Sequence, residues 1–256
     1  MEDRLPTTHD LDSVTLQLSD LEKSFGTQRA LDGASLSVAA GECVAIVGES
    51  GSGKTTMLRC INRLVDPDAG RVEVNGRSVM DQDATQLRRS LGYVPQDGGL
   101  MPHWRILRNV ALVPWLSGMP DADDRAMNAL RLVGFDPPDV VDRWPHELSG
   151  GQRQRVAIAR ALAAGQSCLL LDEPFSALDA ITRAELQQSF RTLRAESRFT
   201  AVLVTHDLRE AMSLGDRIAV MYRGKVEQIG TPDDVRNNPA TPYVAKLLAY
   251  ADIVKQ

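Results

Sequence analysis

A glycine-rich segment that follows a short apolar run carries the first residues that could do chemistry. It reads Gly48-Glu49-Ser50-Gly51-Ser52-Gly53-Lys54-Thr55. Glycines allow main-chain N–H groups to converge on the phosphates of a nucleotide, and a helix that begins here directs its positive end at the same anion. Lys54 adds a positive charge, the hydroxyl of Thr55 can bind Mg²⁺, and Thr56 can assist. The segment predicts a nucleotide phosphate site, with a glycine-rich turn of no function as the alternative.

Polar side chains also follow three other apolar runs. Asp172 and Glu173 come directly after Cys168–Leu171, and His206 and Gln96 each end a similar run. In open α/β sheets, ligands bind at the carboxyl ends of the strands. Asp172 in that position is expected to hold Mg²⁺, through water. Taken alone, the acidic pair could be a solvated strand end, and a single His or Gln could be a surface residue.

A serine and two glycines stand at the start of a further helical pattern. The segment is Leu148-Ser149-Gly150-Gly151-Gln152. Small polar residues at a helix start offer N–H groups and a hydroxyl to an anion, so this is a second phosphate-binding surface. One chain cannot easily bring two such surfaces to the same γ-phosphate.

These three segments, in this order, resemble the ATP-binding cassette ATPase, the nucleotide-binding subunit of an ABC transporter and most closely of an importer. The resemblance extends from about Leu16 to about Ala249. It implies a P-loop NTPase fold, ATP and Mg²⁺ as cofactors, and ATP hydrolysis coupled to transport through a membrane.

The resemblance also implies roles for single residues. Glu173 corresponds to the general base that polarises the attacking water, and His206 to a switch residue that contacts the γ-phosphate. Gln96 corresponds to a residue that touches both Mg²⁺ and the water. Phe25 stands where the family stacks an aromatic ring on adenine, although a core Phe is the alternative.

A pair of chains follows from the same resemblance. In the family two copies lie head to tail, and each ATP lies between the phosphate loop of one copy and the equivalent of Ser149–Gln152 in the other. The segment Ser176–Asp179 resembles the loop along the contact between the copies, so Asp179 is counted with the nucleotide site. The second copy completes the site, as an arginine finger does when it is supplied in trans.

Composition is consistent with a soluble cytosolic protein. The chain has 256 residues, of which 43% are hydrophobic, and a net charge of −5, which gives no indication of nucleic-acid binding. No apolar run approaches the roughly 18–20 residues that span a bilayer, and the polar start indicates no signal peptide. The expected location is therefore the cytoplasmic face of the cell membrane, with the pore formed by separate permease subunits. A solute-binding protein would be an indirect partner.

The pattern of apolar residues predicts the elements that position these side chains. Residues 1–13 are expected to be a flexible tail, and residues 14–256 a single ABC ATPase domain. Short strands with turns at Gly26, Gly33 and Gly41 are expected over residues 16–47, and a helix over residues 55–64. The fold class is α/β, with a mostly parallel sheet core, an antiparallel β subdomain and a helical subdomain inserted at about 97–147.

Two segments bear on the transport system. The segment 97–110 resembles the region of importers that receives short helices from the membrane subunits, although the family often has an acid where Arg108 stands. The segments 96–100 and 179–183 resemble the glycine betaine and osmoprotectant importers. Relatives with a regulatory domain are longer, and none is expected here.

Other functions stay open. An importer ATPase for a polar amino acid or a phosphonate is the main alternative substrate class. A cassette ATPase outside transport usually carries two cassettes or a long coiled coil, and no such heptads are present. A nucleotide-binding scaffold without turnover would not need Lys54, Glu173 and His206 together.

Overall fold

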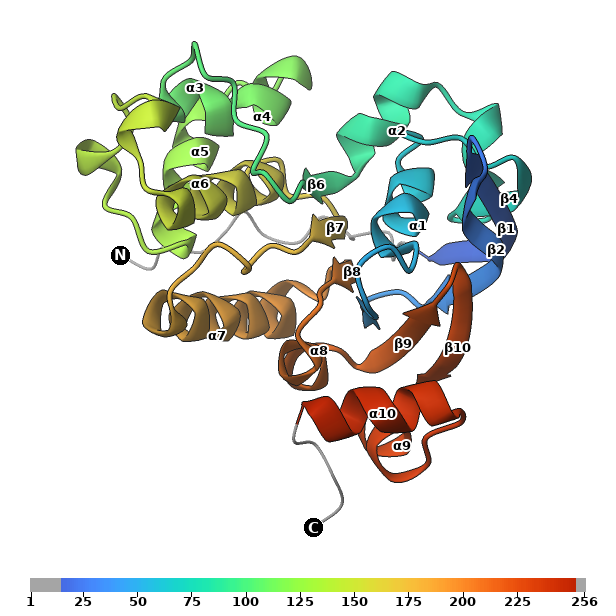
Figure 1. Ribbon diagram of the computed structural model, residues 1–256. Coiled ribbons are helices and arrows are strands. Elements are labelled where there is room, and N and C mark those ends of the chain that lie inside the picture. Colours follow the sequence, from blue (N-terminus) through green and yellow to red (C-terminus); the bar gives the residue numbers. More distant parts are fainter. Residues whose placement is uncertain (1–14, 252–256) are drawn as a thin grey trace.

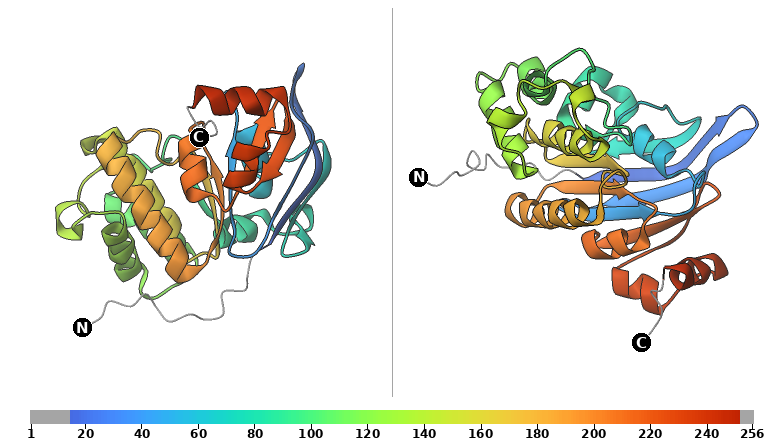
Figure 2. Two further views of the ribbon diagram at one scale, coloured as in Figure 1. Left: turned by 90° about the horizontal axis from the view of Figure 1, so that it is seen from below. Right: turned by 60° about the vertical axis from the view of Figure 1, so that its left-hand side comes forward.

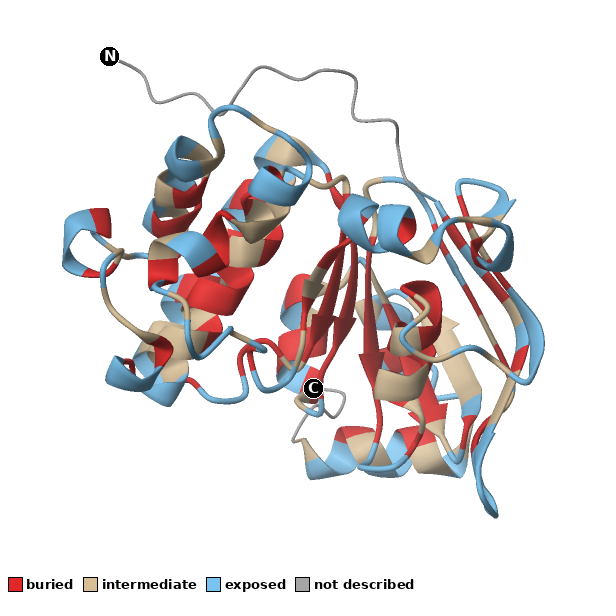
Figure 3. Ribbon diagram, turned by 90° about the horizontal axis from the view of Figure 1, so that it is seen from above, coloured by how far each residue is buried: buried red, intermediate tan, exposed pale blue. Residues whose placement is uncertain are grey.

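The computed structural model describes residues 15–251, so the predicted tail lies outside the described residues. Six strands form the core sheet in the order β10-β9-β3-β8-β7-β6, and every neighbouring pair is parallel except β10 with β9 (Figure 1). The strands are β3 (Cys43–Val47), β6 (Gly92–Val94), β7 (Cys168–Asp172), β8 (Thr200–Val204), β9 (Arg217–Tyr222) and β10 (Lys225–Gly230). Residues of β3, β7 and β8 are buried throughout, because layers cover both faces of a parallel sheet (Figure 3).

A second, antiparallel sheet stands beside this core in the order β2-β1-β4-β5 (Figure 2). Its strands are β1 (Leu16–Phe25), β2 (Gln28–Val38), β4 (Ala69–Val74) and β5 (Arg77–Ser78). The prediction of a turn at Gly33 is wrong. Gly33 lies inside β2 with φ 75°, where the pairing register with β1 shifts, so the glycine permits a bulge instead of a reversal.

Helices cover both faces of the core sheet. They are α1 (Lys54–Ile61), α2 (Ala84–Ser90), α6 (Gly150–Leu162), α7 (Ala180–Ser197), α8 (Leu208–Leu214), α9 (Pro232–Asn237) and α10 (Pro242–Tyr250). On one face, Val44 and Ile46 of β3 pack with α1 and the antiparallel sheet. On the opposite face, Ala45 and Val47 pack with α8 and α10. Alternation along β3 therefore joins two of the hydrophobic layers.

Helix α1 is shorter than the apolar pattern predicted. It ends at Ile61, and Arg63 adopts a left-handed φ of 54°. The N–H groups of Leu64 and Val65 both donate to the carbonyl of Arg59, which closes the helix with a tight turn. Leu64 consequently projects outward and is 49% exposed instead of continuing the buried stripe.

A helical lobe fills the segment between β6 and β7 (Figure 1). Besides α6 it contains α3 (Ile106–Val110), α4 (Leu112–Leu116), α5 (Ala122–Leu132) and the 3-10 helices η2 (Pro137–Asp139) and η3 (Pro145–Glu147); a further 3-10 helix, η1 (Val79–Asp81), follows β5. Ile106, Leu130 and Val156 meet in one buried cluster that continues to Leu171 of the core sheet. Within residues 15–251, no helix combines the length and the apolar character that crossing a bilayer requires.

Candidate nucleotide site

The glycine-rich segment connects β3 to α1 and is pressed against neighbouring backbone. A Cβ atom at Gly48 would lie 2.1 Å from the carbonyl oxygen of Met221, and one at Gly53 would lie 2.3 Å from that of Ala30. Gly53 also has φ 103°, outside the range that other residues adopt readily. Both positions therefore require glycine, and the strand, loop and helix follow one another as the motif predicts.

Lys54 closes this loop from within. Its Nζ donates to the carbonyl oxygens of Gly48 at 2.8 Å and Glu49 at 2.9 Å. Burial lowers the pKa of Lys54, while the carboxylates of Glu173 and Asp172 oppose that change. The ammonium group is thus held at the concave side of the loop, where an anion would add to its stabilisation.

Thr55 and Asp172 join the loop to the end of β7. The hydroxyl of Thr55 donates a 2.8 Å hydrogen bond to Oδ1 of Asp172. Asp172 is fully buried, and this burial raises the pKa of its carboxyl group. Its second oxygen, Oδ2, is buried without a hydrogen-bond partner among the residues described. An unpaired buried carboxylate oxygen beside a hydroxyl is a donor set that fits a hard cation such as Mg²⁺.

Glu173 lies between two of the predicted site residues. Its Oε2 is 2.9 Å from Nδ1 of His206 and accepts a 3.4 Å hydrogen bond from Nε2 of Gln96. The backbone of Glu173 has a left-handed φ of 49°, an unfavourable conformation for a residue with a side chain. Because the chain turns there, the carboxylate leaves the strand alternation of β7 and faces the ends of β6 and β8.

The serine and glycines of the second phosphate-binding segment begin α6. Ser149 Oγ accepts from the N–H of Gln152 at 3.1 Å, and the Gln152 side chain accepts from the N–H of Ser149 at 3.0 Å. Ser149 and Gly150 are exposed. Gly151 lies close to the loop before α7, since a Cβ there would be 3.1 Å from the Leu178 side chain. The capping box fixes this helix start and leaves its outer surface open.

Two other predicted residues lie at the ends of elements. Asp179 is the N-cap of α7 and accepts from the N–H groups of Ile181 at 3.1 Å and Thr182 at 3.0 Å. These hydrogen bonds lower the pKa of Asp179. Phe25 ends β1 and is 52% exposed, so it is not a core residue. The remaining loop residues, Ser50, Gly51 and Ser52, precede α1, and Thr56 lies in its first turn.

One chain thus brings the phosphate loop, Asp172, Glu173, His206 and Gln96 to the carboxyl ends of the parallel strands. The start of α6 is not among these residues. Helix α6 belongs to the helical lobe, and Figure 1 shows it apart from α1. Two neighbouring residues were missed by sequence reasoning. Glu210 is buried and lines the same small pocket as His206, and Tyr243 of α10 contacts the phosphate loop. The spacing of residues gives no signal for either, because both contacts depend on tertiary packing.

Known proteins share this fold and these sequence segments. Residues 31–176, more than half of the chain, match the family model described as ABC transporter. The chain therefore belongs to the ABC transporter family. The dimeric structure of the ATP-binding cassette MJ0796, in a post-hydrolysis state bound to ADP and Pi, matches with a TM-score of 0.79 and 35% identity. That match covers 85% of this chain and 98% of the other, and it confirms the predicted α/β cassette fold.

Two curated relatives are transport proteins. The choline transport ATP-binding protein OpuBA of Bacillus subtilis (strain 168) is 44% identical over 243 residues, which are 94% of this chain and 64% of that protein. The glycine betaine uptake system ATP-binding protein YehX of Escherichia coli (strain K12) is 40% identical over 240 residues, 93% of this chain and 78% of that protein. The chain therefore spans slightly less than two thirds of the length of OpuBA.

Proposed function

We propose that this chain is the ATP-hydrolysing subunit of an ABC importer. The observation that carries the proposal is the position of Glu173, whose carboxylate lies between His206 and Gln96 and follows directly on Asp172. In this arrangement Glu173 accepts a proton from the attacking water, while His206 and Gln96 orient the reacting groups. The phosphate loop and Lys54 bind the triphosphate, and Phe25 stacks on adenine.

Thr55, Asp172 and Gln96 would hold Mg²⁺. The unpaired Oδ2 of Asp172 supports this assignment, since a bound cation would give that oxygen a partner. Among residues 15–251 no three His, Cys, Asp or Glu side chains cluster as a metal site, so phosphate oxygens and water must complete the ligand set. When bound, Mg²⁺ would offset the negative charge that develops on the phosphates.

The complete site needs a second copy of the chain. Ser149 and Gly150 present an open helix start, which is a surface suited to the γ-phosphate of an ATP on the other copy. Asp179 and the loop before it would lie along the contact between the copies. The MJ0796 cassette is dimeric, which supports a pair of copies by analogy.

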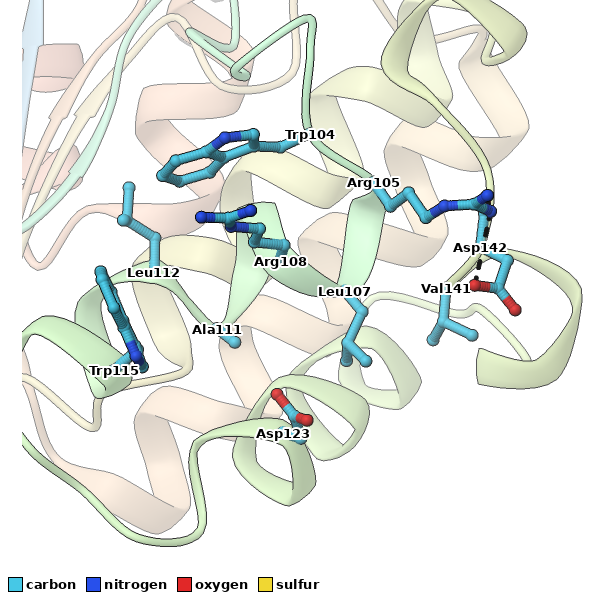
Figure 4. Close-up of a pocket in the computed structure, with 10 residues that line it drawn as sticks. All are labelled: Trp104, Arg105, Leu107, Arg108, Ala111, Leu112, Trp115, Asp123, Val141 and Asp142. Carbon is cyan, nitrogen blue, oxygen red and sulfur yellow. Dashed lines mark hydrogen bonds and ion pairs between the residues drawn. The ribbon is translucent and has the colours of Figure 1, made fainter.

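A groove in the helical lobe is the proposed contact for the permease. It has a volume of about 380 Å³ and is lined by residues of α3, α4 and α5 and of the segments before α3 and η3 (Figure 4). Trp115 is 63% exposed at its edge, and the guanidinium of Arg108 lies 4.3 Å from the Trp104 ring centroid. An amphipathic helix that buries apolar residues here would couple the ATPase to the pore. The chain would then lie at the cytoplasmic face of the membrane.

The proposed cargo is glycine betaine, choline or a related osmoprotectant. The names of OpuBA and YehX support this class. The cargo itself would contact a separate binding protein and the permease. A polar amino acid or phosphonate importer is the alternative.

The direct test is MgATP hydrolysis by the purified chain and by Glu173→Gln. The wild-type protein should release phosphate, and the substitution should retain MgATP binding while turnover falls at least about a hundredfold. Near wild-type turnover in Glu173→Gln would refute the assigned base. Uptake of labelled glycine betaine in cells with and without this chain tests the cargo.

A further inference from the structure

We propose that Tyr243 is a positioning residue of the nucleotide site, an inference that rests on the proposed ATP binding. Tyr243 lies in the first turn of α10, 194 residues from the phosphate loop in sequence. Its hydroxyl oxygen accepts a 3.1 Å hydrogen bond from the N–H of Glu49. Glu49 is the second residue of the loop, so this bond holds the loop where it leaves β3.

The tyrosine side chain is itself fixed. Its ring stacks on Tyr222 at the end of β9, with centroids 4.1 Å apart and planes 25° from parallel. The next residue, Val244, is fully buried, and Leu248 one turn later is nearly so. Both pack with Val47, the residue that precedes the phosphate loop. Burial also raises the pKa of Tyr243, so the hydroxyl stays protonated near neutral pH.

Helix α10 also contacts the other side of the site. Nε of Arg209, in the helix that follows His206, donates to the carbonyl of Ala251 at 3.2 Å. The first turn of α10 therefore contacts the phosphate loop, and Ala251, directly after its last turn, contacts α8. Helix α10 therefore contacts both the phosphate loop and α8.

The hydrogen bond between Tyr243 and Glu49 should increase the affinity of the phosphate loop for nucleotide. Main-chain N–H groups bind phosphate well only when they already converge, because ordering a loop on binding costs free energy. The other restraints on the loop are the hydrogen bonds from the N–H of Ser52 to the carbonyl of Glu49 and from the N–H of Gly224 to the carbonyl of Ser52, together with those of Lys54. Without the Tyr243 hydroxyl, the N–H of Glu49 loses the hydrogen bond that joins the start of the loop to α10.

The test compares Tyr243→Phe with Tyr250→Phe in the full chain. The first removes the hydroxyl and keeps the stacked ring; the second removes a hydroxyl from the 79% exposed tyrosine at the far end of the same helix. Tyr243→Phe should raise the Kd for MgATP about three- to tenfold, the size expected for one lost hydrogen bond. Its kcat at saturating MgATP should stay within about twofold, so that KM alone rises. Tyr250→Phe should match wild type.

Thermal unfolding without nucleotide checks that both variants are folded. An unchanged Kd in folded Tyr243→Phe overturns the inference, and so does an equal weakening in Tyr250→Phe. A wild-type chain that does not bind MgATP overturns the proposed function instead, and this inference with it. Wild-type binding together with an unchanged Tyr243→Phe overturns the positioning role alone.

Discussion

The hydroxyl of Thr55 donates a 2.8 Å hydrogen bond to the carboxylate of Asp172, and this contact joins the first turn of α1 to the end of β7. The two residues are 117 positions apart. The other carboxylate oxygen of Asp172 is buried with no hydrogen bond inside the described part of the chain. This pair of side chains therefore has one acceptor without a donor, which fits the proposed cation site.

Asp172→Asn should therefore remove the effect of Mg²⁺ on the affinity for ATP. The amide oxygen still accepts from Thr55, but the negative charge is lost. We expect MgATP affinity to fall to that of ATP in EDTA, and hydrolysis to fall about a hundredfold or more, since metal charge stabilisation is worth several kcal/mol. Nucleotide titrations with and without Mg²⁺ measure this. An Asp172→Asn protein that still binds ATP more tightly with Mg²⁺ would refute the metal assignment.

Phe25→Ala should weaken recognition of the base and leave that of the phosphates intact. The ring is 52% exposed, with the Lys23 ammonium 5.6 Å from its centroid. Loss of one base stack is worth about 1–3 kcal/mol, so the Kd for ATP should rise roughly tenfold. Phe25→Tyr is the matched control and should bind as wild type does. Equal losses for ATP and for inorganic triphosphate would show that Phe25 acts on the fold and not on adenine.

Glu210 should make stability depend on pH. Burial, aided by Asp207, raises the pKa of Glu210 from 4.5 to about 8, while Arg183, on the neighbouring helix, and the Thr205 hydroxyl oppose the rise. The folded chain thus keeps a proton that the unfolded chain loses. Stability from this group is complete below about pH 4.5 and is lost as pH rises through about 8.

Glu210→Gln should flatten this dependence, because the amide stays uncharged. Urea unfolding between pH 5 and pH 9 should show wild type losing stability relative to the variant, by an amount on the order of a few kcal/mol. Identical pH slopes in the two proteins would show that folding does not raise the pKa of Glu210.

The groove of the helical lobe predicts variants that uncouple transport from hydrolysis. Arg108→Glu reverses the charge beside Trp104, and Trp115→Ala removes an apolar contact at the edge. Hydrolysis by the isolated chain should stay within about twofold. Uptake by the assembled complex should fall at least about tenfold, because truncated interface anchors cost 2 kcal/mol or more. Tyr250→Ala, an exposed aromatic residue on α10, is the control. Unimpaired uptake in both groove variants would place the permease elsewhere.

Local sequence predicted the elements around the site well, for physical reasons. Continuous apolar runs, such as Val44–Val47 and Leu169–Leu171, are typical of central strands that are buried on both faces of a parallel sheet. The prediction of a turn at Gly33 is wrong because a glycine with positive φ occurs in bulges as well as in turns. The predicted end of α1 is wrong because Leu64 continues the apolar pattern, although the backbone of Arg63 is no longer helical.

The site residues differ in how far the sequence could predict them. Positions next to a strand end, such as Glu173 and His206, could be predicted as candidates because strand ends of a parallel sheet converge, while their roles come from the family resemblance. Tyr243 and Glu210 could not be found that way. Tyr243 reaches the loop through the packing of α10, and the environment of Glu210 is created by the burial of α8 against its neighbours.

We expect one nucleotide to be bound by the phosphate loop of one copy and by Ser149–Gln152 of another. Light scattering of Glu173→Gln with MgATP tests it most directly, because slow turnover should hold the pair closed. Ser149 is exposed, so Ser149→Arg can block the contact surface at a cost of about 1 kcal/mol for the lost cap. We predict a dimer for Glu173→Gln, and a monomer that still binds MgATP for Glu173→Gln/Ser149→Arg. A MgATP-dependent dimer of equal stability in the double variant would contradict the shared site.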